Sequence, residues 1–130
     1  MKQENKILLL QDLCARLPYG VKCQIKGEED FEPLKLKSFI QGKGFYAFDF
    51  YIKENSSLTF KELDEFKPYL FPLSSMTSKQ KAELSILVLG VEDIFKALLI
   101  EVEFYHKHHV DYRGLIPMGL ANDATNLNIY

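Results

Sequence analysis

The strictest constraint on the fold is the segment 45–53, in which side chains alternate between two kinds. One face of an extended chain there carries Tyr46, Phe48, Phe50 and Ile52, and the other carries Ala47, Asp49, Tyr51 and Lys53. A period of two residues is typical of a strand, and the ring-rich face is the one that we expect in the core. The preceding Gly42-Lys43-Gly44 indicates a tight hairpin, because glycine reaches positive φ without a steric penalty.

Two earlier segments show the same alternation. Residues 21–26 and 34–40 both place apolar side chains at every second position, which predicts two further strands. The simplest arrangement of three such strands is an antiparallel meander. We expect a short helical turn at 59–66, where Thr59 and Glu62 match a capping box. The two prolines in 67–75 favour an extended connection rather than a strand.

Helical periodicity appears at both ends of the chain. Residues 5–17 repeat apolar side chains three and four apart, and Pro18 ends that helix. Thr77 and Gln80 match a capping box and start a helix over 78–89. After Gly90, a last helix runs to about residue 109, and we expect its apolar stripe to be buried: Phe95, Leu98, Leu99, Val102 and Tyr105. The sequence thus predicts an α+β fold, a small antiparallel sheet of about three strands packed against N-terminal and C-terminal helices.

The chain has 130 residues, and no linker or repeat divides it, so we expect a single domain over 1–130. The tail 122–130 is polar until its last residues, and we expect it to fray. The net charge is −2 and Arg16 and Arg113 are the two arginines, a balance that does not favour nucleic acid or an anionic membrane.

Localisation follows from the cysteines and the apolar runs. Cys14 and Cys23 form no CxxC or zinc pattern, which is typical of reduced thiols. The apolar run 7–10 is too short for a signal peptide, and no run approaches the ~18 residues of a membrane span. We therefore expect a cytoplasmic protein with no membrane partner.

The densest group of polar side chains lies at 106–113 and contains His108 and five further residues. We interpret those five as a candidate binding site: His106, His109, Asp111, Tyr112 and Arg113. Residues at the end of a helix also bond its free carbonyl groups, so a structural role stays open. The spacing does not match the HExxH zinc motif, and we assign no metal ligand, no catalytic residue and no cofactor.

Five short segments carry a resemblance: LCARLPYGVKC at 13–23, KPYL at 67–70, SSMT at 74–77, HHVDYRGLI at 108–116 and GLA at 119–121. Together they resemble a family of short uncharacterised bacterial and phage-borne proteins. The resemblance implies no activity, cofactor or catalytic residue. Its phage association favours an accessory role.

We interpret the chain as a small cytoplasmic binding or accessory protein that acts through protein contacts. The contact surface that we expect is the segment 111–120 with its histidine flank, because clustered polar and aromatic groups in loops often bind. The alternative is a nucleic-acid-associated accessory protein. A second alternative is a small metal-assisted or acid–base enzyme that uses His106, His109 and Asp111.

Overall fold

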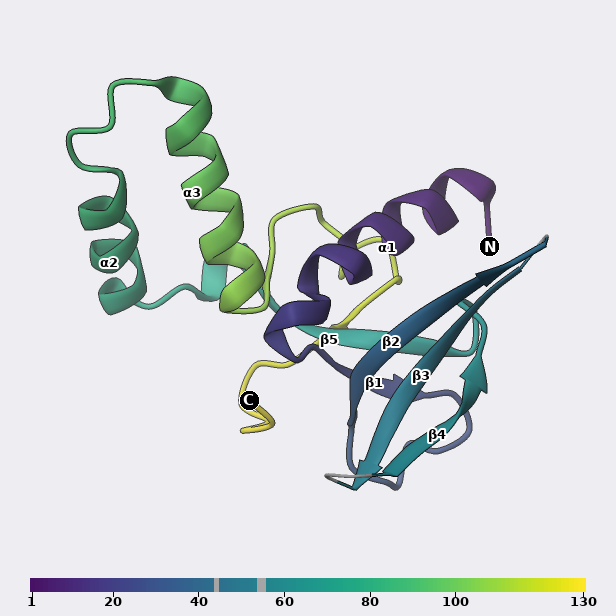
Figure 1. Cartoon of the computed structure of the whole chain (residues 1–130). Coiled ribbons are helices and arrows are strands. Elements are labelled where there is room, and N and C mark those ends of the chain that lie inside the picture. Colours follow the sequence, from purple (N-terminus) through teal and green to yellow (C-terminus); the bar gives the residue numbers. More distant parts are fainter. Residues whose placement is uncertain (44, 54–55) are drawn as a thin grey trace.

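The computed structural model describes residues 1–43, 45–53 and 56–130, and it combines helices at both ends of the chain with a twisted sheet (Figure 1). The helices are α1 (Gln3–Arg16), α2 (Ser78–Val88) and α3 (Ile94–Lys107), with short 3₁₀ turns η1 (Leu17–Tyr19) and η2 (Leu73–Ser75). The strands are β1 (Lys22–Ile25), β2 (Leu34–Gly42), β3 (Phe45–Lys53), β4 (Ser56–Lys61), β5 (Phe66–Pro72), β6 (Val110–Asp111) and β7 (Asn122–Asp123).

The sheet has the strand order β4-β3-β2-β1-β5-β6, and β7 also pairs with β5. The pairs from β4 to β5 are antiparallel, whereas β6 and β7 run parallel to β5. The α+β class is therefore confirmed, but the expected three-stranded meander undercounts the sheet, which is larger and mixed.

Strands β4 and β5 replace the helical turn and the extended connection that we expected there. In β5, Phe66, Pro68 and Leu70 are buried and alternate with half-buried residues. Proline is rare in a central strand because it lacks an N–H group. Pro68 nevertheless lies opposite Cys23 of β1 in the register. The two prolines led us to predict an extended connection, whereas the alternating burial of side chains in β5 is that of a strand.

The predicted pairing of β2 with β3 is confirmed, with Gly42 opposite Phe45. Phe48 and Phe50 of β3 are fully buried, whereas Tyr46 and Ile52 of the same face are exposed, because the strand extends beyond the core at both ends. The predicted hairpin turn includes Gly44, which lies outside the described residues.

Helix α1 lies across one side of the sheet and supplies the top of the core (Figure 1). Its buried face is centred on Leu9 and Leu13. Below them, the ring of Phe66 meets Phe48 and Phe50 edge to face, with centroids 5.2 and 5.0 Å apart. Such aromatic pairs add specific geometry to the area that they bury, so these rings fix how β3 and β5 approach.

Helices α2 and α3 form an antiparallel pair that projects away from the sheet (Figure 1). The predicted capping box of Thr77 and Gln80 is confirmed, and the Asp93 side chain caps α3. The predicted buried stripe is wrong, because Phe95 is 74% and Leu99 is 69% exposed. The periodicity identified an apolar face, but nothing in the sequence indicates whether another element covers it. None of the helices in these described ranges has the length and hydropathy that crossing a bilayer requires.

The tail, which we expected to fray, is held against the sheet. The Tyr130 hydroxyl accepts a hydrogen bond from the Lys22 backbone N–H at 2.8 Å and donates one to the Tyr69 carbonyl at 2.7 Å. The Tyr130 ring also stacks on His109, with centroids 3.6 Å apart. Strand β7 holds the tail as well, and Ala124 after it is fully buried and donates its backbone N–H to the Leu70 carbonyl at 2.8 Å.

Candidate functional site

A buried ion pair on α1 organises the junction where α1, α3 and β6 meet. Asp12 and Arg16 lie one helical turn apart, and the Arg16 Nε atom is 2.7 Å from an Asp12 carboxylate oxygen. Both side chains are fully buried. Arg16 also donates to the backbone carbonyls of Val110 at 2.7 Å and Tyr105 at 3.5 Å. These bonds tie α1 to the end of α3 and to the segment that follows it.

Arg113 binds the same carboxylate from the other side. Its Nε atom donates to the second Asp12 oxygen at 3.2 Å. Among the described residues, no other carboxylate forms a salt bridge with either guanidinium group. One negative charge therefore faces two positive charges. The Arg113 side chain is 26% exposed, so the excess positive charge reaches solvent there.

Both guanidinium groups lie over the Tyr112 ring, with central carbons 5.7 Å (Arg16) and 5.0 Å (Arg113) from its centroid. Its other neighbours are Tyr105, which stacks on it at 5.5 Å, and His106, whose Nε2 atom is 2.7 Å from the Tyr112 hydroxyl. Cation–π attraction stabilises such an arrangement. The three exposed or half-buried groups His106, Tyr112 and Arg113 thus form one continuous surface, which we call the Arg113 surface.

The protonation of the Arg113 surface follows from its burial and its positive charge. Burial lowers the pKa of His106, and the Arg16 and Arg113 guanidinium groups lower it further. Burial raises the pKa of the Tyr112 phenol, and the Arg113 charge opposes that rise. Both groups are consequently neutral at pH 7, and the guanidinium group is the charged member of the surface.

The other two predicted site residues point elsewhere. His109 is buried, adopts a φ of +59° and has a ring Nδ1 atom with no hydrogen-bond partner in the described part of the chain. Burial and, to a smaller extent, the positive charge of Arg16 lower the pKa of His109 to about 4. Asp111 is also buried and accepts hydrogen bonds from the backbone N–H groups of Leu115 and Ile116, both at 2.8 Å. Asp111 thus shapes the following turn, and His109 supports Tyr130.

Sequence reasoning missed Asp12 and Arg16, although a signal for both was present. An aspartate followed by an arginine four residues later is a spacing that pairs charges on one helix face. Arg16 also continues the i, i+4, i+7 series of Leu9 and Leu13, which places it on the buried face.

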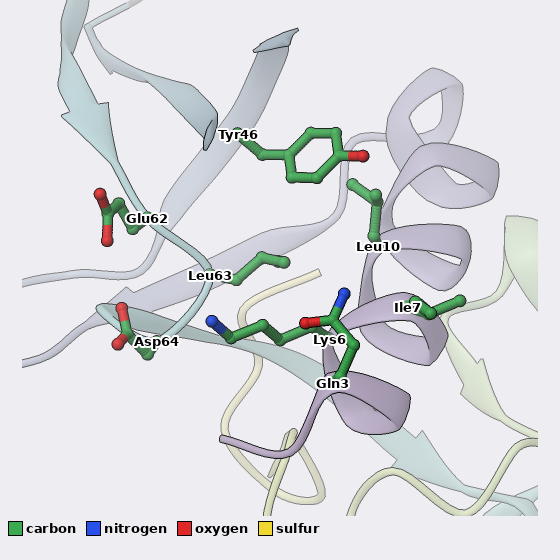
Figure 2. Close-up of a pocket in the computed structure, with 8 residues that line it drawn as sticks. All are labelled: Gln3, Lys6, Ile7, Leu10, Tyr46, Glu62, Leu63 and Asp64. Carbon is green, nitrogen blue, oxygen red and sulfur yellow. The ribbon is translucent and has the colours of Figure 1, made fainter. Parts of the chain in front are cut away.

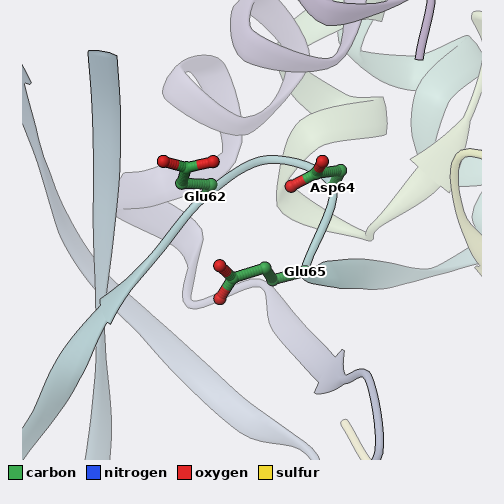
Figure 3. Close-up of side chains that lie close together, drawn as sticks. All are labelled: Glu62, Asp64 and Glu65. Atoms are coloured by element: carbon green, nitrogen blue, oxygen red, sulfur yellow. The ribbon is translucent and has the colours of Figure 1, made fainter.

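Three carboxylates gather elsewhere, at the turn between β4 and β5. The carboxylate oxygens of Glu62, Asp64 and Glu65 lie within 4.8 Å of one another (Figure 3). Glu65 is 3.9 Å from the amine of Lys61. Two of the three are exposed, as in many solvated acidic turns.

A hollow lies between the first half of α1 and this turn (Figure 2). Its walls include Lys6 and Leu10 of α1, Tyr46 of β3, and Leu63. Its volume is about 230 Å³, below the roughly 300–1,000 Å³ of most small-molecule pockets. No residue of the Arg113 surface lines it.

The fold defines a small α+β protein with a mixed sheet and a projecting helix pair. No protein-family model matches the chain, and no curated protein and no solved structure matches it significantly. The resemblance to bacterial and phage-borne proteins stays a prediction.

Proposed function

We propose that this is a non-enzymatic accessory protein that acts through protein contacts and receives an acidic side chain of its partner at the Arg113 surface. One observation carries the proposal. Among the described residues, the carboxylate of Asp12 alone forms salt bridges with both arginines of the chain. A carboxylate from a partner would balance the remaining positive charge.

The chemistry of the surface favours a carboxylate. A guanidinium group presents several N–H donors in a plane, which matches the two oxygens of an aspartate or glutamate. Arg113 is fixed in place by Asp12 on one edge and by the Tyr112 ring on one face. Less side-chain entropy is lost when a fixed arginine binds than when a free one does.

The nucleic-acid alternative rests on the same charge, because a phosphate also binds arginine. Phosphate-backbone binding requires a surface on which cations outnumber anions, but this chain carries 16 lysines and arginines against 18 acidic residues. Its one partly exposed guanidinium group is that of Arg113. The enzyme alternative retains His106 with Tyr112, since His109 and Asp111 are buried in other contacts. Both alternatives are outcomes of the test below.

We place the function in the cytoplasm, in keeping with a phage-associated accessory role. Cys14 and Cys23 are free cysteines, and burial raises the pKa of both thiols. One buried and one half-buried thiol, both with raised pKa values and neither in a disulfide, fit a reducing compartment.

The test is a titration of the ¹⁵N-labelled protein with a hexaglutamate peptide at low salt. We expect shifts at the amides of residues 106, 112 and 113, and their loss in Arg113→Gln. Lys107→Gln is the matched control, because it removes an exposed positive charge at the end of α3 without touching the surface.

Shifts that persist in Arg113→Gln, or no shift at millimolar peptide, would contradict the proposal. A single-stranded oligonucleotide that displaces the peptide would favour the nucleic-acid alternative instead. Bound zinc, iron or manganese in the purified protein would favour the metal-assisted enzyme.

A further inference from the structure

Three lysines gather on the sheet where β1, β2 and β3 lie side by side (Figure 1). Lys22 of β1 lies directly opposite Lys35 of β2 in the register, and Lys37 follows two positions along β2. The side chains of Cys23 and Leu36 beside them are buried, so the three lysines lie on the face of the sheet that points away from the core. Like charges directly opposite each other destabilise a sheet, so this placement does not serve stability.

The amines of Lys35 and Lys37 are held together over one ring. The Tyr51 ring of β3 has the Lys35 Nζ atom 5.8 Å and the Lys37 Nζ atom 5.7 Å from its centroid. Lys37 is the extra residue of a β-bulge, between the pairs that Leu36 and Ser38 form with β3. Bulges re-aim side chains and are common beside functional sites. This bulge brings a second cation to the Tyr51 ring.

Two further contacts position Lys35 and Lys22. Gly20 makes room for the Lys35 side chain, because a Cβ atom at Gly20 would lie 3.0 Å from the Lys35 Cε atom. The Lys22 amine donates a hydrogen bond to the backbone carbonyl of Ile129, an acceptor that carries no net charge. Side chains that are already ordered lose less entropy when a ligand binds, so these lysines are prepared for binding.

Neighbouring carboxylates do not balance the charge of the three lysines. Among the described residues, none of the three forms a salt bridge. Glu32 lies in the same groove, and Asp49 lies two positions before Tyr51 on β3. Even when both are counted, three positive charges face two negative ones, which favours an anionic ligand. The acidic side chains of the turn before Glu32 do not line the groove: Glu28, Glu29 and Asp30.

The groove itself has the size of a small-molecule site. Its volume is about 660 Å³, where such sites range over roughly 300–1,000 Å³. Lys22, Lys35 and Tyr51 form part of its lining. Phe31 and Ile52 line it as well and are 69% and 48% exposed. An exposed aromatic ring offers a face on which a nucleobase can stack, so the groove combines cations with an apolar wall.

We propose that this groove binds a nucleoside diphosphate, with its phosphates on Lys22, Lys35 and Lys37 and its base against Phe31. Phosphate oxygens accept strong hydrogen bonds from amines, and their charge relieves the repulsion among the three lysines. Three amines match the charge of one diphosphate, whereas a nucleic-acid backbone is bound through contacts to many phosphates. The site shares no residue with the Arg113 surface and does not depend on it.

The test is a titration of the ¹⁵N-labelled protein with ADP at low salt. We expect shifts at the amides of residues 22, 31, 35 and 51. Lys35→Gln combined with Lys37→Gln should weaken binding by about tenfold or more, because two charged hydrogen-bond donors are lost. Lys79→Gln with Lys81→Gln is the matched control, since it removes two exposed lysines from α2. Circular dichroism establishes that each variant keeps the sheet.

Two single variants separate the base from the phosphates. Phe31→Ala should weaken ADP by about tenfold, the usual value of one stacked base, and leave pyrophosphate binding unchanged. Glu32→Gln should tighten both ligands by about two- to fivefold, because it removes a negative charge from the groove. Both side chains are exposed, so neither change is expected to disturb the fold.

Two results with ADP would overturn the proposal: no shift at these amides at millimolar concentration, or equal affinity for the wild type and for Lys35→Gln with Lys37→Gln. Pyrophosphate that binds as tightly as ADP would overturn the assignment of a base. Hexaglutamate or a single-stranded oligonucleotide that binds this groove more tightly than ADP would replace the nucleotide by a macromolecular partner. The peptide titration at Arg113 reports on residues 106, 112 and 113, so either proposal can fail alone.

Discussion

Asp12 and Arg16, one turn apart on α1, form an ion pair whose two side chains are both fully shielded from solvent. Removing one partner of such a pair leaves an uncompensated charge in the interior, which is far more costly than the pair itself is stabilising. Any substitution that removes one of the buried charges is therefore expected to destabilise the junction of α1, α3 and β6.

Asp12→Asn is expected to lower the free energy of unfolding by about 3–5 kcal/mol, because two guanidinium groups lose their carboxylate. Arg113→Gln is the matched control. It leaves Asp12 and Arg16 as a balanced pair and should cost less than about 1 kcal/mol. Urea denaturation of both variants measures the difference, and equal losses would show that the shared carboxylate is not what holds the junction.

Stability is expected to fall as the pH is lowered from 6.5 towards 4. The folded protein holds the His109 pKa at about 4, below its ordinary value of 6.5, so the unfolded chain binds the extra proton in this range. Neutral His109 makes its full contribution to the free energy of unfolding above pH 6.5. On acidification this contribution falls by up to about 1.4 kcal/mol per pH unit. Burial lowers the pKa values of His106 and His108 as well, which acts in the same direction.

His109→Asn isolates that effect, because asparagine tolerates the positive φ at this position but does not titrate there. We expect thermal melts between pH 4 and pH 7 to show a shallower slope for this variant than for the wild type. A slope that does not change would assign the acid sensitivity to other groups.

Tyr130→Phe is expected to cost about 1–2 kcal/mol, since the hydroxyl bonds both Lys22 and Tyr69. Tyr130→Ala also removes the stacking on His109 and should cost about 3 kcal/mol. Chemical denaturation gives both values, and hydrogen exchange at residues 122–124 reports on the tail. A Tyr130→Ala variant as stable as the wild type would mean that the tail frays after all.

Thr77→Ala is expected to destabilise α2 by about 1 kcal/mol, because it removes one half of the capping box. The effect should be local. Hydrogen exchange should quicken in residues 80–88 and stay unchanged in β1 and β5. Equal loss of protection in the sheet would show that helices α2 and α3 unfold together with the sheet as one unit.

The sequence predicted those elements whose signals are local. The capping box at Thr77, the turn at Gly90 and the pairing of β2 with β3 each depend on a few neighbouring residues, and the structure confirms them. Parallel pairing of β5 with β6 and β7 joins segments about 40 or more residues apart, and two-residue strands have no periodicity to detect. The missed strands β6 and β7 follow from that distance, whereas β5 was missed because its two prolines favoured an extended connection.

In the candidate site, too, contacts between sequence neighbours could be predicted and contacts between distant residues could not. Proximity in sequence grouped His106, Tyr112 and Arg113, and the structure brings these three side chains together. It also included His109 and Asp111, because composition does not show which way a side chain points. Asp12 lies 101 positions from Arg113, so only the packing of α1 against the end of α3 brings them together.

The position of β5 has a consequence for synthesis. Its earlier partner β1 precedes it, but β6 and β7 follow it by roughly 40 and 50 residues. At about 5–20 residues per second, one edge of β5 stays without its neighbours for roughly 2–10 s while the ribosome translates helices α2 and α3. An open strand edge can template aggregation during that interval. The rate of translation through the codons of residues 73–123 should therefore affect how much of the chain reaches its native state.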